Sequence, residues 1–295
     1  MKKTKALFLV LVPLLLVYSI SIVPVHSSGL IFIRADGSIE GTNKIHRSGD
    51  TYIFNGDIEE SYGIIVEKNN IIIDGQGHTL KATPRLLPIG SWDFGIELSN
   101  TTTGNVTIKN LEIVDFNIGV YIWTTNNTVT GNTIIGGNVG IFIAESPNMV
   151  VGNYIANNTE GVFLGPLPDT HKTVYNILYQ NSFVNNTIQA YDCECTDPHT
   201  IQHLNIWDNG TIGNYWSDYD GVDANNDGVG DVVYSVSSDD VDLFPLMAPV
   251  ALPLNKNSGF LGTSIPFEFG VALSLGIIAV IAAVLYVAIK RKKSK

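Results

Sequence analysis

Apolar residues between Ile108 and Leu164 recur at a fixed spacing of 21 residues along the chain. Within each copy they alternate with other residues at a period of two, which predicts short β-strands, because successive side chains of a strand point to opposite faces. Glycine and asparagine separate these strands, as turns require. Equivalent positions in the three copies are Ile108, Val129 and Val150; Leu111, Asn132 and Asn153; Ile113, Ile134 and Ile155; and Gly119, Gly140 and Gly161.

Three short strands in 21 residues fit one coil of a parallel β-helix, and a fourth copy follows an insertion around Pro166 and Pro168. A leucine-rich repeat is the main competing architecture, but it needs more leucines than these copies contain. We therefore expect an all-β, right-handed parallel β-helix over residues 29–205. Stacked coils about 4.8 Å apart would align buried amides into a side-chain ladder. The predicted members of that ladder are Asn132, Asn153 and Asn181.

The same alternation assigns one column of side chains to the outside of the coils. Aliphatic residues such as Val120 and Ile122 suit the narrow interior, which turns Tyr121 outward. Exposed aromatic surface often marks a binding site, and aromatic rings suit sugars. We expect carbohydrate binding here, unless a loop or the C-terminal segment covers the column. The full column reads Ile65, Glu97, Tyr121, Phe142, Phe163 and Tyr191, and its predicted ligand-binding members are Tyr121, Phe142, Phe163 and Tyr191.

Two copies of the repeat, NNTVTGNTIIGGNVGIFIA and PNMVVGNYIANNTEGVFLG, resemble the parallel β-helix repeats of NosD-like proteins. The resemblance extends to NNIIIDGQGHTL near the start and to GNYWSDYDGVDANNDGVGD after the last coil, and covers roughly residues 30–247. It implies a fold shared with carbohydrate-binding proteins and sugar hydrolases. It also implies a connection with copper, since NosD-like proteins are associated with maturation of the copper site of nitrous oxide reductase.

An acidic segment follows the coils, in a region that we expect to cap the helix (206–247). Oxygen ligands at alternate positions, with glycine after the third, can wrap a calcium ion. The loop resembles the calcium loops of dockerins and thrombospondin type 3 repeats, and a solvated acidic turn is the alternative. The predicted calcium ligands are Asp223, Asn225, Asp227, the backbone of Val229, and Asp231. The aromatic residues just before the loop are expected to cover the open end of the solenoid. They include Trp207, Tyr215, Trp216 and Tyr219, with Asn214 among them.

A second candidate metal site combines two thiols and two imidazoles. Such soft ligands hold copper or zinc. A strained redox pair or two inert thiols beside surface histidines are the alternatives. The residues are Cys193, Cys195, His199 and His203.

No catalytic residues are predicted. The Asp239–Asp240 pair lies beyond the coils, and the sequence Gly77-His78-Thr79 lacks the second glycine of the sugar-hydrolase pattern. A non-catalytic surface protein that binds carbohydrate therefore ranks above a polysaccharide lyase or hydrolase and above a copper-maturation accessory.

The N-terminal and C-terminal segments predict the cellular location of the protein. Basic residues and a short apolar run make residues 1–28 a signal peptide. Residues 248–266 form a linker, 267–289 a transmembrane helix, and 290–295 a basic cytoplasmic tail, which leaves the ectodomain outside the cell. This arrangement is typical of an archaeal surface protein, with a polysaccharide or surface-layer partner.

The distribution of charge and the glycosylation sequons indicate which partners and modifications to expect. Eight of the 17 basic residues lie in the leader and tail, whereas all 28 acidic residues lie between them. So acidic a surface excludes nucleic acid as a partner. Six Asn-x-Ser/Thr sequons make the ectodomain a candidate glycoprotein. They begin at Asn100, Asn105, Asn126, Asn157, Asn185 and Asn209.

Overall fold

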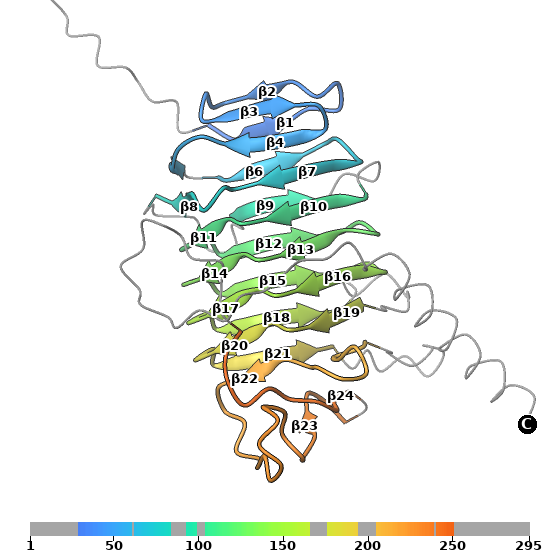
Figure 1. The fold of residues 1–295 in the computed structure, drawn as a ribbon. Helices are drawn as coiled ribbons and strands as arrows, with labels where there is room; N and C mark the ends of the chain where they lie inside the picture. Colours follow the sequence, from blue (N-terminus) through green and yellow to red (C-terminus); the bar gives the residue numbers. More distant parts are fainter. Residues whose placement is uncertain are drawn as a thin grey trace, which may run out of the picture. The chain divides into compact units, whose positions relative to one another are not determined.

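The computed structural model describes residues 29–60, 62–83, 93–98, 104–165, 176–193, 205–238 and 240–250. In these ranges the chain winds into a right-handed parallel β-helix with three sheets, as the repeat predicts (Figure 1). Each full coil contributes one strand to each sheet, and we name the sheets A, B and C.

The strands are distributed as follows. Sheet A contains β1 (Ile31–Ile33), β2 (Ile39–Glu40), β6 (Ile64–Val66), β9 (Phe94–Leu98), β12 (Ile118–Ile122), β15 (Val139–Ile143), β18 (Glu160–Leu164) and β21 (Ile188–Asp192). Sheet B contains β3 (Ile45–Ser48), β4 (Thr51–Phe54), β7 (Ile71–Asp74), β10 (Val106–Lys109), β13 (Thr128–Thr130), β16 (Asn148–Val151) and β19 (Asn176–Tyr179). Sheet C contains β5 (Ile58–Glu60), β8 (Thr79–Ala82), β11 (Glu112–Val114), β14 (Thr133–Ile135), β17 (Tyr154–Ala156), β20 (Ser182–Val184) and β22 (Tyr215–Trp216). A separate hairpin joins β23 (Tyr234–Ser235) to β24 (Val241–Asp242).

The strand register confirms the 21-residue repeat. Ile108 pairs with Val129, and Val129 pairs with Val150, in parallel strands of sheet B. In sheet C the register aligns Ile113, Ile134 and Ile155 in the same way. All six side chains are buried, so the aliphatic residues of the repeat form the core that holds the coils together.

From β10 onward, a single residue in the left-handed conformation turns the chain at each corner between sheets B and C. These residues are Asn110, Gly131, Gly152 and Gln180, with φ between 54° and 67°. Glycine and asparagine adopt this conformation at low cost. The turn directs the next side chain into the interior, which is where the predicted ladder begins. Four of the sequon asparagines, Asn105, Asn126, Asn157 and Asn185, also occupy positive-φ positions and are exposed.

The predicted amide ladder is present and longer than expected. The Oδ1 atom of Asn153 accepts hydrogen bonds from Asn132, and Asn153 in turn donates to Asn181. The ladder continues from Asn181 to Asn214, and the carboxylate of Asp242 accepts its last hydrogen bond. A second buried ladder follows the corner between sheets A and B, through Asn127, Asn148, Asn176 and Asn205.

Antiparallel strands and aromatic rings close the two ends of the coils. At the N-terminal end β2 pairs with β1, and β3 pairs with β4. At the other end the ring of Trp216 lies between Phe183 and Tyr234, with centroids 4.6 and 4.2 Å away. Asp242 accepts a hydrogen bond from Trp216 Nε1 at 2.9 Å, which ties the β23–β24 hairpin to this stack.

Several predicted segments lie outside the residues that the structure describes. They are the signal peptide, the greater part of the linker, the transmembrane helix and the cytoplasmic tail. Within the described ranges no helix is long and apolar enough to cross a membrane. The membrane anchor therefore stays a prediction from the sequence.

Candidate binding site at the open end of sheet A

The outward column of sheet A has the predicted register. Tyr121 pairs with Glu97 on one side and with Phe142 on the other. The column then continues through Phe163 to Tyr191. Val120 and Ile122 are fully buried on the opposite face, as the alternation requires.

The aromatic rings of this column stack on one another. Ring centroids lie 5.3 Å apart for Tyr121 and Phe142, 4.8 Å for Phe142 and Phe163, and 5.1 Å for Phe163 and Tyr191. The ring planes of Phe142 and Phe163 are nearly parallel, with an angle of 5° between them. Rings that pack face to face in this way present their edges, and not their faces, to solvent.

The column is therefore less exposed than the sequence predicts. Phe142 is only 6% exposed and belongs to a small apolar cluster with Ile118, Val139 and Ala144. Burial also raises the pKa of Tyr121 to about 12. The expectation of an exposed aromatic stripe is wrong for the middle of the column, because each ring covers its neighbours.

Tyr191 differs from the other rings because it ends the column. It is 42% exposed, and Ile188 beside it on β21 is 41% exposed. Sheets B and C continue past this coil through Ile206 and β22, but no described strand is added to sheet A after β21. One face of the Tyr191 ring thus packs on Phe163, and no described ring of the column covers the other.

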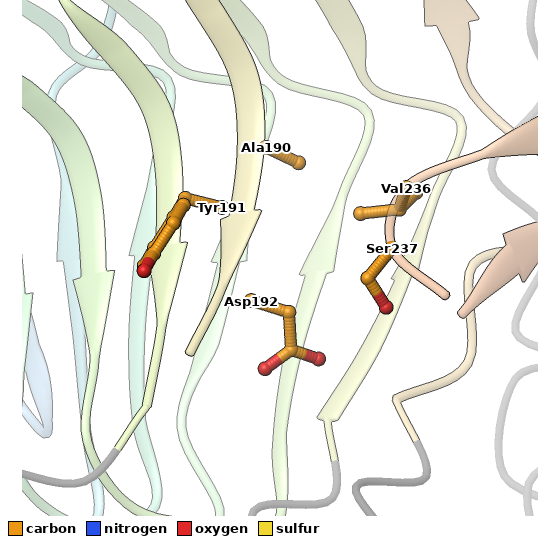
Figure 2. A pocket seen from close by; sticks show the side chains of 5 residues that line it. All are labelled: Ala190, Tyr191, Asp192, Val236 and Ser237. Atoms are coloured by element: carbon orange, nitrogen blue, oxygen red, sulfur yellow. The ribbon is translucent and has the colours of Figure 1, made fainter. Parts of the chain in front are cut away.

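A pocket of about 430 Å³ lies at this edge of sheet A, lined by Ala190, Tyr191, Asp192, Val236 and Ser237. Figure 2 shows the Tyr191 side chain on one side of β21 and the Asp192 carboxyl on the other, toward Ser237. Asp192 is in register with Leu164, so a carboxyl group stands where the preceding coil has an aliphatic side chain. The site therefore combines an aromatic ring with a carboxyl group across one strand edge.

Asp192 is in contact with a second buried carboxyl group, that of Asp240 near the cap hairpin. Asp240 is 3% exposed, and burial together with its hydrogen bond to Asp192 raises its pKa well above the ordinary carboxyl range. Asn205 Nδ2 donates to Asp192 Oδ2 at 2.9 Å. Asp240 also lies beside the side chains of Trp207 and Asn205, but Asp240 Oδ2 and Trp207 Nε1 have no partner of good hydrogen-bond geometry among the described residues. Such atoms commonly mark a place where water or a polar ligand binds.

This buried acid predicts how stability depends on pH. A carboxyl group whose folded pKa is raised stabilises the fold below its unfolded pKa, and that stability is lost as pH rises through the folded pKa. The Tm should therefore fall between about pH 4 and pH 8, with a smaller contribution from Asp242, whose pKa burial raises to about 6. Asp240→Asn should reduce the fall in Tm over this pH range by several degrees, because the asparagine amide that replaces the buried carboxyl group cannot ionise.

Thermal denaturation of the ectodomain across this pH range tests the prediction. The control is Asp220→Asn, which removes the same charge from an exposed position of the cap. An equal effect of the two variants would show that net charge, and not the buried pair, governs the pH dependence.

The acidic loop is well ordered by its own hydrogen bonds. Asp223 accepts from the backbone N–H groups of Asp227 and Gly228, and Asp231 accepts from that of Ala224 at 2.7 Å. Among the described residues, however, no group of three or more His, Cys, Asp and Glu side chains is arranged to hold a metal ion. The calcium prediction, with Asn225 and Val229 as further ligands, thus finds no support in the structure.

The thiol and imidazole site can be tested only in part. Cys193 is partly exposed and follows β21 directly, next to Gly165. Cys195, His199 and His203 lie outside the described ranges. The residues that the structure does describe supply one soft ligand here and do not by themselves form a copper site.

The sequence alone did not reveal the pocket or the carboxyl pair. Asp192 and Asp240 are far apart in the chain and meet only because the cap hairpin folds back under β21. One signal was present, because Asp192 breaks the aliphatic pattern of the interior column at the last coil. A charged residue at a lining position indicates either an end of the core or a functional site.

Three sheets wound around an aliphatic core define the class of right-handed parallel β-helix proteins. The family model described as "Periplasmic copper-binding protein (NosD)" matches residues 26–221, and the chain belongs to this family. The suggested resemblance is thereby confirmed. No protein in a search of curated sequences matches the chain.

Proposed function

We propose that this protein is a non-catalytic binding protein of the exported compartment that takes a carbohydrate at the open end of sheet A. The observation that carries the proposal is the half-exposed ring of Tyr191 beside a lined pocket. An aromatic ring can cover the apolar face of a sugar, while nearby polar groups bind its hydroxyls. The family's description as periplasmic agrees with an exported location.

The geometry favours binding over sugar hydrolysis. Hydrolases of this kind hold two carboxyl groups about 5–9.5 Å apart, so that a sugar and a water molecule fit between them. Asp192 and Asp240 instead share a hydrogen bond, which leaves no room for the scissile bond. A β-helix lyase would need a basic residue, and the described chain after Lys109 contains no lysine, arginine or histidine.

Retention on a panel of immobilised polysaccharides tests this function. The wild-type ectodomain should be retained by at least one polysaccharide, and Tyr191→Ala should lose that retention, because the substitution removes the ring. Tyr62→Ala is the matched control, since Tyr62 is equally exposed, at 41%, but lies on an earlier coil. Retention that survives in Tyr191→Ala, or none in the wild type, would refute the proposal.

Copper binding is a second candidate function, favoured by membership of the NosD family. The sequence supplies the required soft ligands in Cys193, Cys195, His199 and His203. Chelator competition with Cu(I) should show about one ion bound to the wild type, and replacement of both cysteines by serine should weaken binding roughly a hundredfold. Equal affinity of the two proteins would exclude this site.

A further inference from the structure

The surroundings of the pocket are strongly acidic. Among the described residues that follow Lys109, the chain carries no basic side chain, whereas carboxyl groups are frequent in the last coils and the cap. Asp192 is the carboxyl group among them that lines the pocket. Such a field attracts cationic ligands and repels anionic ones.

The groups that line the pocket suit an ammonium ion. The exposed ring of Tyr191 lies at the outer side of the β21 edge, and aromatic rings attract ammonium groups as well as sugar faces. The Asp192 carboxyl lines the inner side, next to Ser237. Behind Asp192 lies the buried carboxyl group of Asp240, which is in contact with Asp192. Two carboxyl groups in contact repel each other when ionised, and a nearby positive charge relieves that repulsion.

From this arrangement we propose that the carbohydrate bound at the pocket is an amino sugar with a free, protonated amine. The inference rests on the proposed binding function and specifies its ligand. The sugar ring covers the free face of Tyr191, and its ammonium group donates to the Asp192 carboxyl across the strand edge. A charge-assisted hydrogen bond of this kind distinguishes a free amine from its N-acetylated form, which is neutral and bulkier. Uronic-acid polymers are rejected by the same carboxyl groups.

Calorimetric titration of the wild-type ectodomain with short glucosamine oligomers tests the proposal, at a pH below the pKa of the glucosamine amine. The comparison ligands are N-acetylglucosamine oligomers of the same length and oligogalacturonate. We expect glucosamine oligomers to bind about tenfold or more tightly than their N-acetylated counterparts, with this preference reduced in high salt, and oligogalacturonate not to bind.

Variants then separate the ring from the carboxyl group. Asp192→Asn should abolish the preference for the free amine but keep residual binding of the N-acetylated oligomer. Asp220→Asn, an exposed cap carboxyl, should leave the preference unchanged. Tyr191→Ala should lose both ligands. If Asp192→Asn does not fold, the comparison of amine, N-acetyl and salt on the wild-type protein still decides the question.

The results of these titrations distinguish failure of the amino-sugar inference from failure of the carbohydrate-binding function. Equal affinity for the amine and the N-acetylated sugar would overturn the amino-sugar inference while leaving carbohydrate binding intact. Oligolysine of matched charge that binds as tightly as glucosamine would show that charge alone is recognised, which also overturns it. If none of the sugar ligands binds here and none of the wider panel is retained, the proposed function itself is wrong.

Discussion

Asn153→Ala is expected to lower the free energy of unfolding by roughly 3–6 kcal/mol, because several buried polar groups lose their partners at once, at about 1–3 kcal/mol each. Asn153 is 1% exposed. Its Oδ1 atom accepts two hydrogen bonds at 3.0 Å, from the backbone and side chain of Asn132. Its Nδ2 atom donates to Val129 O at 2.8 Å and to Asn181 Oδ1 at 3.0 Å.

A loss of this size is a large part of the about 5–15 kcal/mol that stabilises a typical domain. Urea denaturation of the ectodomain should show it as a much lower midpoint. Asn138→Ala, which truncates an exposed asparagine in a neighbouring turn, should leave the midpoint nearly unchanged. Similar midpoints for the two variants would mean that the buried ladder contributes little to stability.

Gly140→Ala is expected to destabilise the central coils by about 3 kcal/mol or more, since a new methyl group would meet backbone that cannot move aside. A Cβ at this position would lie 2.5 Å from the carbonyl oxygen of Gly161 and 2.8 Å from Ile155 Cγ2. The clash is with the next coil, so relieving it requires the spacing between strands to open. We expect little folded protein on expression.

Gly56→Ala is the matched control for this substitution. Its nearest neighbour would be the flexible side chain of Lys44, at 3.8 Å, and its φ is not in the left-handed region. The yield of soluble ectodomain and its circular dichroism spectrum compare the two. A Gly140→Ala protein that folds and melts like Gly56→Ala would contradict the close coil packing described above.

The repeat made the coils predictable because it fixes both the strand period and the stacking register. Asn132, Asn153 and Asn181 were predicted as a ladder since they fall at equivalent positions of successive copies. Its continuation to Asn214 and Asp242 was not, because the spacing between coils lengthens after Asn181 and the pattern loses its period. The ladder through Asn127 and its partners escaped prediction although its residues are just as deeply buried.

The site was predictable only as a column of residues. Alternation placed Tyr121, Phe142, Phe163 and Tyr191 on one face, and the register agrees. How much of each ring is available depends on side-chain packing between coils, which no one-dimensional pattern contains. The same holds for the contact of Asp192 with Asp240, which arises from the path of the cap and not from the repeat.

The central claim is that the free face of Tyr191, and not the aromatic column as a whole, binds the ligand. It is tested most directly by the dissociation constants of Tyr191→Ala and Tyr121→Leu for the carbohydrate that retains the wild-type protein best. Tyr121 packs between Phe94 and Phe142, so Tyr121→Leu should bind within about twofold of the wild type, while Tyr191→Ala should bind about tenfold or more weakly. Wild-type affinity in Tyr191→Ala together with lost affinity in a folded Tyr121→Leu protein would contradict the claim.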